Sequence, residues 1–383
     1  MEAGAARPRS AIAWMAAALV LVVIAGVVYL RPGAAGASVQ PAAVRQLTGP
    51  SSESLVNLSF ADARRGSVTV DRQAQGLHKA EAYVTADGGA TWKRAAPLTY
   101  LTARMVIQHA QSTPGAERIS SDGGRTWRVL SMPGSSSPAL GMPDFADAAH
   151  GWWVVQGLGD PPSVTTVWRT DDGGRTWQPL PRIGIPEADT LTQMRFLDPL
   201  RGVLMARAPD GTPSLFVTDN GGLAWRPVVT LSSPMPGTRP SVAALLARGA
   251  SLLVWMTAVT DAYNQSSTVR TYVTESGDDG LTWSPPRPGP SLEPTVGAPA
   301  LDDRGRLLLL NDRRLWMSPD GGLTWTARVI EAPAGLLAFG PLLAGGTLLA
   351  WASDGSTIGT LRPVYRLLRS TDGGAQWDLV RLP

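Results

Sequence analysis

The sequence predicts an all-β protein: a seven-bladed β-propeller of four-stranded antiparallel blades, preceded by one N-terminal transmembrane helix. Three observations lead to this prediction. A short element recurs seven times, a second element precedes three of the copies, and an uncharged apolar stretch of 20 residues lies near the N-terminus. Repeats at a spacing of 20 to 50 residues are typical of solenoids and propellers, because each unit must stack on its neighbours to bury an apolar face.

The recurring element, called the box below, follows the pattern Ser/Thr-x-Asp/Asn-x-Gly-x-x-Trp. Successive box tryptophans are 35, 50, 48, 58, 42 and 52 residues apart, which is the length of one small antiparallel sheet. The acid or amide and the closing tryptophan of the seven boxes are Asp87 and Trp92, Asp122 and Trp127, Asp172 and Trp177, Asn220 and Trp225, Asp278 and Trp283, Asp320 and Trp325, and Asp372 and Trp377.

Each residue type in the box fits a tight turn between two strands. The short oxygen-bearing side chains accept hydrogen bonds from backbone amides of the turn. The glycine can take a positive φ, and the tryptophan can fill the space between neighbouring sheets. The box residues are therefore interpreted as structural.

A Phe-x-Asp-x-x-x-Gly element precedes three of the boxes, with its Phe 27, 27 and 24 residues before the box Asp or Asn. The three copies run from Phe60 to Gly66, from Phe145 to Gly151 and from Phe196 to Gly202. Two landmarks in nearly fixed register indicate a true structural repeat.

Between these landmarks the sequence has short strand patterns separated by turn residues. The sixth repeat shows four of them, at Gly297 to Leu301, Arg306 to Leu310, Leu315 to Met317 and Thr324 to Ile330. Evenly spaced short strands indicate a ring of four-stranded blades. The 35-residue second repeat leaves room for a reduced blade, so six or eight blades stay open as alternatives.

The boxes resemble the Asp-box, or BNR, repeats of sialidases, sortilin-type receptors and the photosystem II stability/assembly factor. The paired Phe-x-Asp element is most similar to the bacterial relatives of that last group, and the resemblance covers residues 51–383. It implies a propeller whose boxes lie at the turn between the third and fourth strands, away from the ligand site. It implies little about activity, because many functions share this fold.

The N-terminal region predicts membrane attachment. Residues 1–10 are expected in the cytoplasm, 11–30 as a transmembrane signal anchor, 31–50 as an Ala/Gly/Pro-rich tether and 51–383 as the propeller. Arg7 and Arg9 precede the apolar stretch, which places the propeller outside the cytoplasmic membrane by the positive-inside rule. Cleavage near Ala37, giving a secreted protein, is the alternative.

Composition excludes several classes of function. The net charge of +3 comes largely from the first 31 residues, and the remainder is nearly neutral. We therefore expect no nucleic-acid partner and no acidic-substrate funnel. Cysteine is absent, which excludes disulfides, thiolate catalysis and cysteine-ligated zinc.

We expect no metal and no cofactor. The histidines His78, His109 and His150 are scattered singly, and no nucleotide-binding or hydrolase motif is present. Clustered box acids could be read as calcium ligands. The turn explains all of them except Asp171 and Asp279, and the spacing of a calcium-binding loop is missing.

An exo-acting, sialidase-like glycosidase on cell-surface glycans is the enzymatic alternative. Such enzymes need paired acids, or a Tyr/Glu nucleophile beside an acid. The resemblance further implies an N-terminal Arg-Ile-Pro motif, which has no match here; residues 181–186 come nearest but contain an inserted glycine. Three arginines with a Tyr/Glu pair at the propeller axis would favour the glycosidase.

Six tryptophans outside the boxes are expected to pack within blades. Trp152 and Trp153 are the pair to watch, because adjacent strand residues face opposite sides of a sheet. The other four are Trp168, Trp255, Trp316 and Trp351.

A meander places the first and third turns of every blade on one face of the disc and the second turns on the other. The second face carries the loops Gly157 to Ser163, Ala208 to Thr212 and Asp261 to Ser267. Loops on a rigid scaffold often carry function. The candidate partner contacts are Asp160, Asp261, Tyr263 and Asn264.

The function expected from these features is non-catalytic: an extracytoplasmic, membrane-anchored propeller that acts as a protein-binding or complex-assembly module. Its expected partners are the membrane, through the N-terminal helix, and a protein of the cell envelope, with a glycan as a further possibility. The ring is expected to close by packing of the last blade on the first, or by an added strand from Val44 to Leu47.

Overall fold

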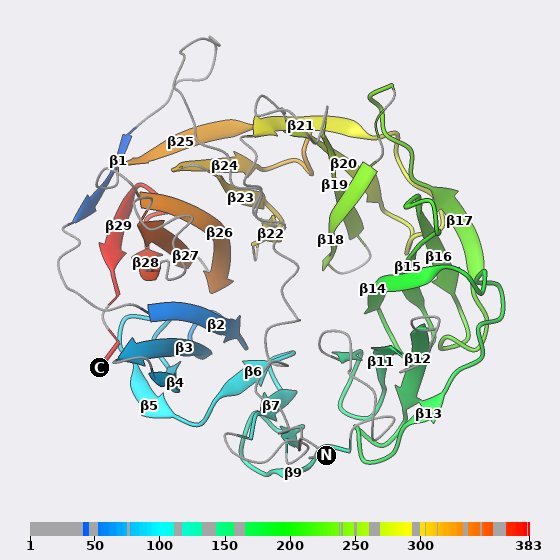
Figure 1. The fold of residues 1–383 in the computed structure, drawn as a ribbon, viewed down its shortest axis with the longest axis horizontal. Coiled ribbons are helices and arrows are strands. Elements are labelled where there is room, and N and C mark those ends of the chain that lie inside the picture. The colour runs from blue at the N-terminus through cyan, green and yellow to red at the C-terminus, as the bar shows by residue number, and fades with distance from the viewer. Residues whose placement is uncertain are drawn as a thin grey trace, which may run out of the picture.

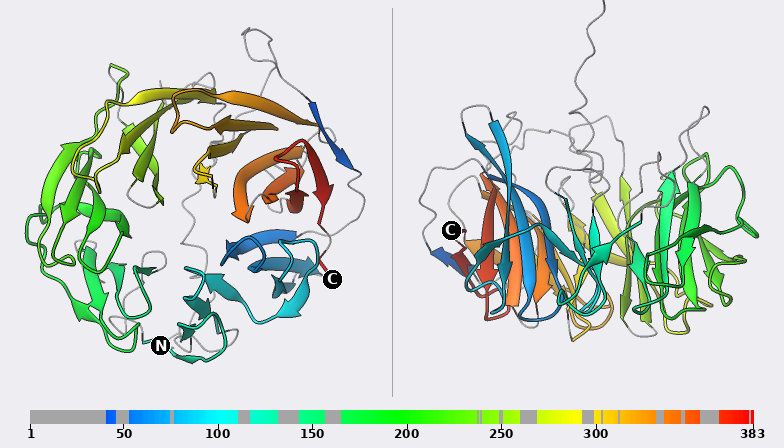
Figure 2. Two further views of the ribbon diagram at one scale, coloured as in Figure 1. Left: turned by 180° about the vertical axis from the view of Figure 1, so that it is seen from behind. Right: turned by 90° about the horizontal axis from the view of Figure 1, so that it is seen from below.

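The computed structural model is an all-β ring, drawn face-on in Figure 1 and edge-on in Figure 2. It describes residues 41–45, 53–74, 77–110, 117–131, 143–156, 165–236, 238, 240–248, 251–259, 269–292, 299–302, 304–311, 313–331, 336–344, 347–354, 365–380 and 382–383. Within these ranges no helix has the length and apolar character of a membrane span. The predicted anchor, residues 11–30, lies outside them.

Seven blades make up the ring, each an antiparallel meander of four strands. Figure 1 shows the first strand of a blade nearest the axis and the fourth on the rim. In chain order the blades are β2 (Glu53–Phe60), β3 (Gly66–Ala74), β4 (Leu77–Thr85) and β5 (Lys93–Ala95); β6 (Leu98–Tyr100), β7 (Val106–Gln108), β8 (Arg118–Ser120) and β9 (Arg128–Val129); β10 (Asp144–Phe145), β11 (Gly151–Gln156), β12 (Thr165–Thr170) and β13 (Gln178–Pro179); β14 (Thr190–Phe196), β15 (Gly202–Arg207), β16 (Pro213–Thr218) and β17 (Arg226–Thr230); β18 (Pro240–Arg248), β19 (Ser251–Val259), β20 (Val269–Ser276) and β21 (Arg287–Leu292); β22 (Ala300–Leu301), β23 (Leu307–Asn311), β24 (Arg314–Ser318) and β25 (Thr326–Glu331); and β26 (Leu336–Ala344), β27 (Thr347–Asp354), β28 (Tyr365–Ser370) and β29 (Gln376–Leu379).

The predicted seven-bladed architecture is therefore confirmed. The short second repeat forms a complete blade, and it is reduced only in the length of its strands, none of which exceeds three residues.

One further strand, β1 (Pro41–Arg45), lies within the segment expected to be a tether. It pairs in parallel with β25 of blade six and with β29 of blade seven, so the two blades join in one nine-stranded sheet. An added strand was one of the two predicted forms of ring closure. It lies a few residues earlier than expected, and it links blade six to blade seven instead of blade seven to blade one.

The core consists of apolar clusters between neighbouring blades. Six clusters of described residues each join two adjacent blades, blade seven to blade one included. Trp152 and Trp153 are both buried, on opposite faces of blade three. Trp152 stacks on Phe196 of blade four, whereas Trp153 packs in the cluster shared with blade two.

The joint between blades one and two differs from the other six, because polar contacts connect its two blades. Asn57 on β2 donates to the hydroxyl of Thr99 on β6 over 2.6 Å, and that hydroxyl lies 2.7 Å from Nε2 of His109. Burial lowers the pKa of His109, which favours the neutral imidazole at this joint. Close by, the Tyr100 amide donates to Ser59 over 2.9 Å.

Candidate functional site

Each box is a turn closed by its own side chains. In blade two, the amide of Gly124 donates to the hydroxyl of Ser120 over 2.8 Å. The amide and hydroxyl of Thr126 donate to the two oxygens of Asp122 over 2.9 and 2.6 Å. The indole of Trp127 returns a bond to the carbonyl of Gly124 over 3.1 Å. In this blade the box side chains are thus engaged in closing their own turn.

These hydrogen bonds stabilise the ionised form of the box acids. The hydroxyl and amide of Thr91 lower the pKa of Asp87 to about 2, and the box threonine of blade five lowers the pKa of Asp278 to about 2. Asn220 accepts the hydroxyl of Thr218 over 2.9 Å and the amide of Ala224 over 3.0 Å, but alanine at position 224 has no hydroxyl to donate. The carboxylates are occupied by their own turns and offer little to a ligand.

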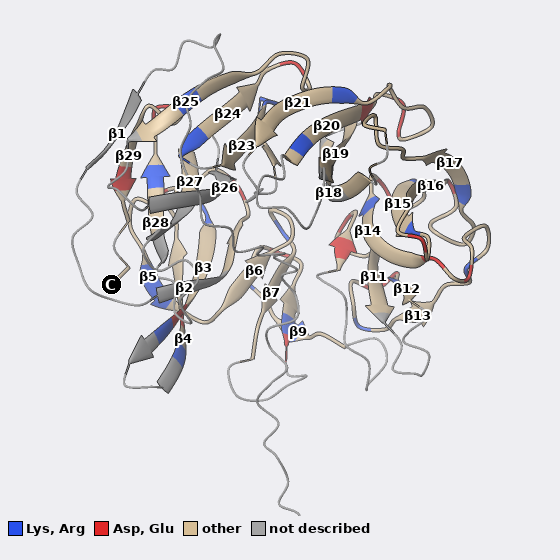
Figure 3. Cartoon of the chain, turned by 45° about the horizontal axis from the view of Figure 1, so that its top comes forward, with Lys and Arg blue, Asp and Glu red and all other residues tan. Residues whose placement is uncertain are grey.

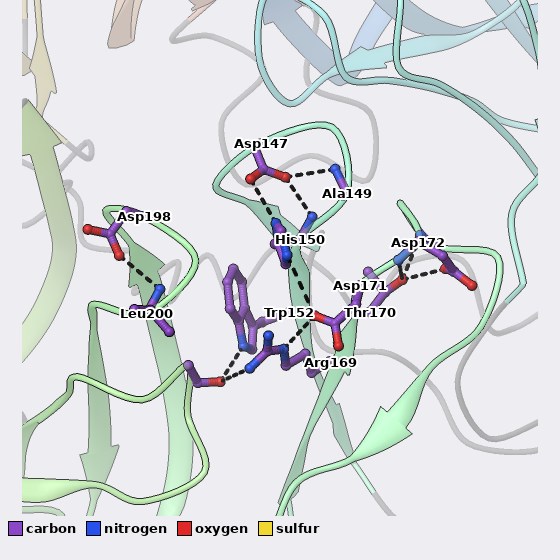
Figure 4. Close-up of polar contacts among 12 residues, drawn as sticks. Asp147, Ala149, His150, Trp152, Arg169, Thr170, Asp171, Asp172, Asp198 and Leu200 are labelled. Atoms are coloured by element: carbon purple, nitrogen blue, oxygen red, sulfur yellow. Dashed lines mark hydrogen bonds and ion pairs between the residues drawn. The ribbon is translucent and has the colours of Figure 1, made fainter.

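The Phe-x-Asp turn lies directly beside the box of the same blade. In blade three, Asp147 accepts the amides of Ala149 and His150 over 2.7 Å each (Figure 4). The amide of Gly173 in the box donates to the carbonyl of Ala149, also over 2.7 Å. Both landmarks therefore lie on one face of the disc, as the meander predicted, and we call it the box face.

The two acids that the turn did not explain are paired with arginines. Arg169 donates to Asp171 over 2.7 Å (Figure 4), and Arg201 forms an ion pair with Asp279. Among the described residues, no group of three or more His, Cys, Asp or Glu is arranged to hold a metal ion. The calcium interpretation therefore has no support in the described chain.

An arginine crosses every joint of the ring on the box face. In six joints the guanidinium of one blade donates to a backbone carbonyl of the next. In the joint between blades four and five it pairs instead with Asp279, the residue after the box acid. In ring order the contacts are Arg65 to Ala103, Arg128 to Gly173, Arg169 to Gly221, Arg201 to Asp279, Arg287 to Gly321, Arg328 to Gly373 and Arg369 to Gly88. We call this set the arginine ring.

A hollow opens on the box face at the joint between blades one and two. Its volume is about 370 Å³. The residues that line it are Arg65, Ala103, Arg104, Ser121, Asp122, Gly123 and Arg125. Arg65 is held by Asp62, 2.7 Å from its Nε. The exposed side chains of Arg104 and Arg125 form no ion pair with another described residue.

The hollow is therefore suited to an anion. Its one carboxylate, Asp122, already accepts bonds from its own turn, whereas the guanidiniums of Arg104 and Arg125 are free to donate. Guanidinium groups bind carboxylates with two parallel hydrogen bonds. The sequence did not predict this site, because Arg65 and Arg125 belong to different blades. The only sequence feature that pointed to it was Arg125, the arginine after the box glycine of blade two.

The four candidate contact residues that the sequence predicts, Asp160, Asp261, Tyr263 and Asn264, lie outside the described residues. Of the three predicted loops, only that from Ala208 to Thr212 is described. It is a compact turn in which the Ala208 amide donates to the Thr212 carbonyl over 2.9 Å. The contact residues stay a prediction.

A tyrosine–glutamate pair with nearby cations does occur, but it does not form a glycosidase site. Tyr83 donates to Glu81 over 2.9 Å, and Glu81 also contacts Arg72 and Arg94. Burial would raise the pKa of Glu81, but these donors outweigh it and lower the pKa. Tyr83 is only 1% exposed, and it lies on β4 in the outer half of the blade. A sugar cannot reach it.

The described part of the axis contains an ion pair between one acid and one arginine. Asp144 on β10 and Arg195 on β14, both on innermost strands, are 2.7 Å apart. Burial raises the pKa of Asp144, although Arg195 opposes this effect. The cluster of three arginines that a sialidase-like site requires is not found among the described axial residues.

The fold and this surface define a seven-bladed β-propeller with a box turn in every blade and a cationic hollow on the box face. No protein-family model matches the chain, and no curated protein matches it.

Solved structures do match the chain. The chain is similar to YCF48 bound to a D1 peptide, with 17% identity, 84% of this chain and 92% of that chain covered, and a TM-score of 0.49. It is also similar to YCF48 from Cyanidioschyzon merolae, with 15% identity, coverage of 81% and 96%, and a TM-score of 0.45. A prolyl endopeptidase structure matches at 11% identity, with 86% of this chain and 49% of that chain covered, and a TM-score of 0.53. The resemblance to assembly-factor propellers is confirmed, and at these identities it concerns the fold.

Proposed function

We propose that this protein is a non-catalytic, extracytoplasmic module, anchored to the membrane by residues 11–30, that binds a protein of the cell envelope. The observation that carries the proposal is the hollow between blades one and two, where Arg104 and Arg125 face an open space without carboxylate partners. We infer that it receives an acidic side chain or a terminal carboxylate of the partner.

Two features support binding over catalysis. The box carboxylates and the acids beside them are held by hydroxyl, amide or arginine donors, so they are poorly suited to general acid or base chemistry. Positive charge is also spread around the ring (Figure 3), which favours a local contact over a long polyanion groove. YCF48, a propeller of similar fold, has been solved with a D1 peptide bound.

The opposite face provides a second set of proposed contacts. Asp160, Asp261, Tyr263 and Asn264 remain candidates for the same protein partner or for a glycan. The glycosidase alternative has no observation in the described chain that favours it, since the Tyr83–Glu81 pair is inaccessible.

The test is affinity purification of the detergent-solubilised full chain followed by mass spectrometry. Three variants are compared with wild type: Arg104→Gln/Arg125→Gln in the hollow, Asp261→Ala/Tyr263→Ala/Asn264→Ala on the opposite face, and Arg270→Gln/Arg314→Gln as a charge-matched control. Arg270 and Arg314 are exposed on third strands, away from the hollow.

We expect to recover an envelope protein with the wild type and with the control variant. The amount recovered with the hollow variant should be lower by about tenfold or more, because two charge-assisted contacts are removed. Loss from the opposite-face variant alone would transfer the binding site to those loops. A partner that survives both changes, or no partner at all, would contradict the proposal and call for a screen of glycan substrates.

A further inference from the structure

The residue that follows the box glycine occupies the same place in all seven blades. The glycine φ angles lie between 83° and 91°, and the amide of each glycine is bonded to the first hydroxyl of its box. Because the turns are alike and the blades are arranged in a ring, the seven following residues lie on one circle at one height on the box face.

The identity of this residue changes around the circle in blocks. In ring order from blade one it is Ala90, Arg125, Arg175, Leu223, Leu281, Leu323 and Ala375. Two arginines are thus followed by three leucines on consecutive blades. We call the five positions from Arg125 to Leu323 the rim arc.

The leucines of the rim arc are exposed although nothing in the turn requires an apolar residue there. Leu223, Leu281 and Leu323 are 49%, 50% and 63% exposed, in positions where other blades have alanine or arginine. Two more exposed apolar residues lie against the box of blade four: Leu200, whose carbonyl accepts the Gly221 amide, and Ile183, whose carbonyl accepts the Trp225 amide. Five of the six exposed large apolar side chains of the described chain are therefore gathered at blades four to six.

We propose that the rim arc rests on the surface of an anionic lipid bilayer, with its leucines in the interface and its arginines at the headgroups. The proposal deepens the proposed membrane location, because it gives the propeller an orientation with the box face toward the membrane.

Geometry favours a bilayer over a protein as the occupant. A protein interface concentrates its apolar contacts in one central, fully buried cluster. Here the leucines stand on separate blades, with polar box residues such as Thr282 and Thr324 between them, and they share a plane. A bilayer accepts apolar side chains anywhere in a plane, and neighbouring basic residues add attraction to anionic headgroups.

The charges beside the leucines are compatible with a shallow contact. Asp278 and Asp320 are bonded within their turns, and Asp279 is paired with Arg201. Asp219, in the box of blade four, is exposed, and the proposed orientation places it at the level of the headgroups. Arg125 and Arg175 are exposed at the other end of the arc.

The absence of cysteine makes a site-specific test direct. Single variants Leu281→Cys and Leu323→Cys of the full chain are labelled with NBD and reconstituted into pure-lipid vesicles with or without phosphatidylglycerol. Ala90→Cys, at the same turn position in blade one, is the matched control, and Asp210→Cys reports the opposite face. This turn position tolerates alanine, arginine and leucine in the native chain, so cysteine is expected to fold.

We expect lipid-borne nitroxides to quench positions 281 and 323 at least about twofold more than positions 90 and 210 in anionic vesicles. Arg175→Gln, or omission of the anionic lipid, should reduce that difference. Equal quenching at 281 and 90 would overturn the proposal, as would stronger quenching at 210. If the NBD label at position 281 becomes shielded from solvent only after a membrane-protein extract is added, the rim arc contacts a protein partner instead of the bilayer. Because the vesicles contain no partner, this result is independent of the test of the hollow.

Discussion

Arg369 of blade seven donates from its Nε to the carbonyl oxygen of Gly88, in the box of blade one, over 3.0 Å. The two residues are 281 positions apart in the chain, and their contact closes the arginine ring. The closing joint therefore has the same kind of contact as four of the other joints, in which a guanidinium donates to a backbone carbonyl in the box of the next blade.

Removal of this contact should weaken ring closure. Arg369→Gln is expected to lower the free energy of unfolding by about 1 kcal/mol, since a charge-assisted hydrogen bond to a partly exposed carbonyl is lost. Urea denaturation followed by tryptophan fluorescence gives the value. Arg270→Gln, an exposed arginine without such a contact, should change it by less than about 0.5 kcal/mol. Equal values for the two variants would show that the arginine ring does not stabilise closure.

The architecture could be predicted because its determinants are local. Each box and each Phe-x-Asp turn forms from residues within one short segment, so seven patterns in the sequence predict seven turns and the blades between them. In the Phe-x-Asp elements the glycine has a packing role that the sequence alone did not reveal. A Cβ at Gly66 would come within 2.4 Å of the Phe60 ring.

The hollow and β1 could not be predicted in the same way. Arg65 and Arg125 come together only because blade one packs beside blade two, which depends on the closed ring. The register of β1 depends on the free edges of β25 and β29, and its sequence, Pro41 to Arg45, has no alternating pattern that would mark a strand. The four contact residues predicted for the opposite face lie outside the described residues and stay a prediction.

A pair of glycines should separate steric clash from backbone strain. Gly184 and Gly211 have nearly equal positive φ angles, 86° and 89°. A Cβ at Gly184 would lie 1.7 Å from the carbonyl oxygen of Trp225, whereas nothing lies within 4 Å of one at Gly211. Gly211→Ala should cost about 1–2 kcal/mol for the left-handed backbone alone.

Gly184→Ala should cost about 3 kcal/mol or more, because the segment must also move away from blade four. Chemical denaturation of both variants under one set of conditions measures the difference. Equal losses would mean that the segment around Ile183 is not packed against the box of blade four.

The box aspartates should make stability fall in acid. Their pKa values are lowered in the folded state, to about 2 for Asp87 and Asp278, while the unfolded chain has an ordinary aspartate pKa near 3.8. The unfolded state therefore binds protons first as the pH falls. The stabilisation is fully present above about pH 4 and is lost progressively between about pH 4 and pH 2.

Asp87→Asn is the variant that checks this pH dependence, because box four already contains an asparagine at this position. We expect lower stability than wild type at pH 6, where the carboxylate bonds are lost, and a smaller decrease between pH 4 and pH 2.5. Urea midpoints across this range provide the measurement. Parallel wild-type and variant curves would show that Asp87 does not contribute to the acid response.

Deletion of residues 1–50 tests the role of β1. This strand covers the outer edges of β25 and β29, but every blade keeps its four strands without it, and the apolar cluster between blades six and seven is formed by residues beyond position 300. We therefore expect the shortened chain to fold, with a loss of about 1–3 kcal/mol from the missing strand pairing.

The uncovered edges of β25 and β29 should also make the shortened chain prone to self-association through strand pairing, since free edges attract other strands. Urea denaturation measures the loss of stability, and light scattering at increasing concentration measures the association. The substitution Val329→Lys, on the edge of β25 that the deletion uncovers, should suppress the association without restoring stability. If the shortened chain fails to fold at all, β1 is an integral part of the ring, because blades six and seven then cannot hold their places without the strand between them.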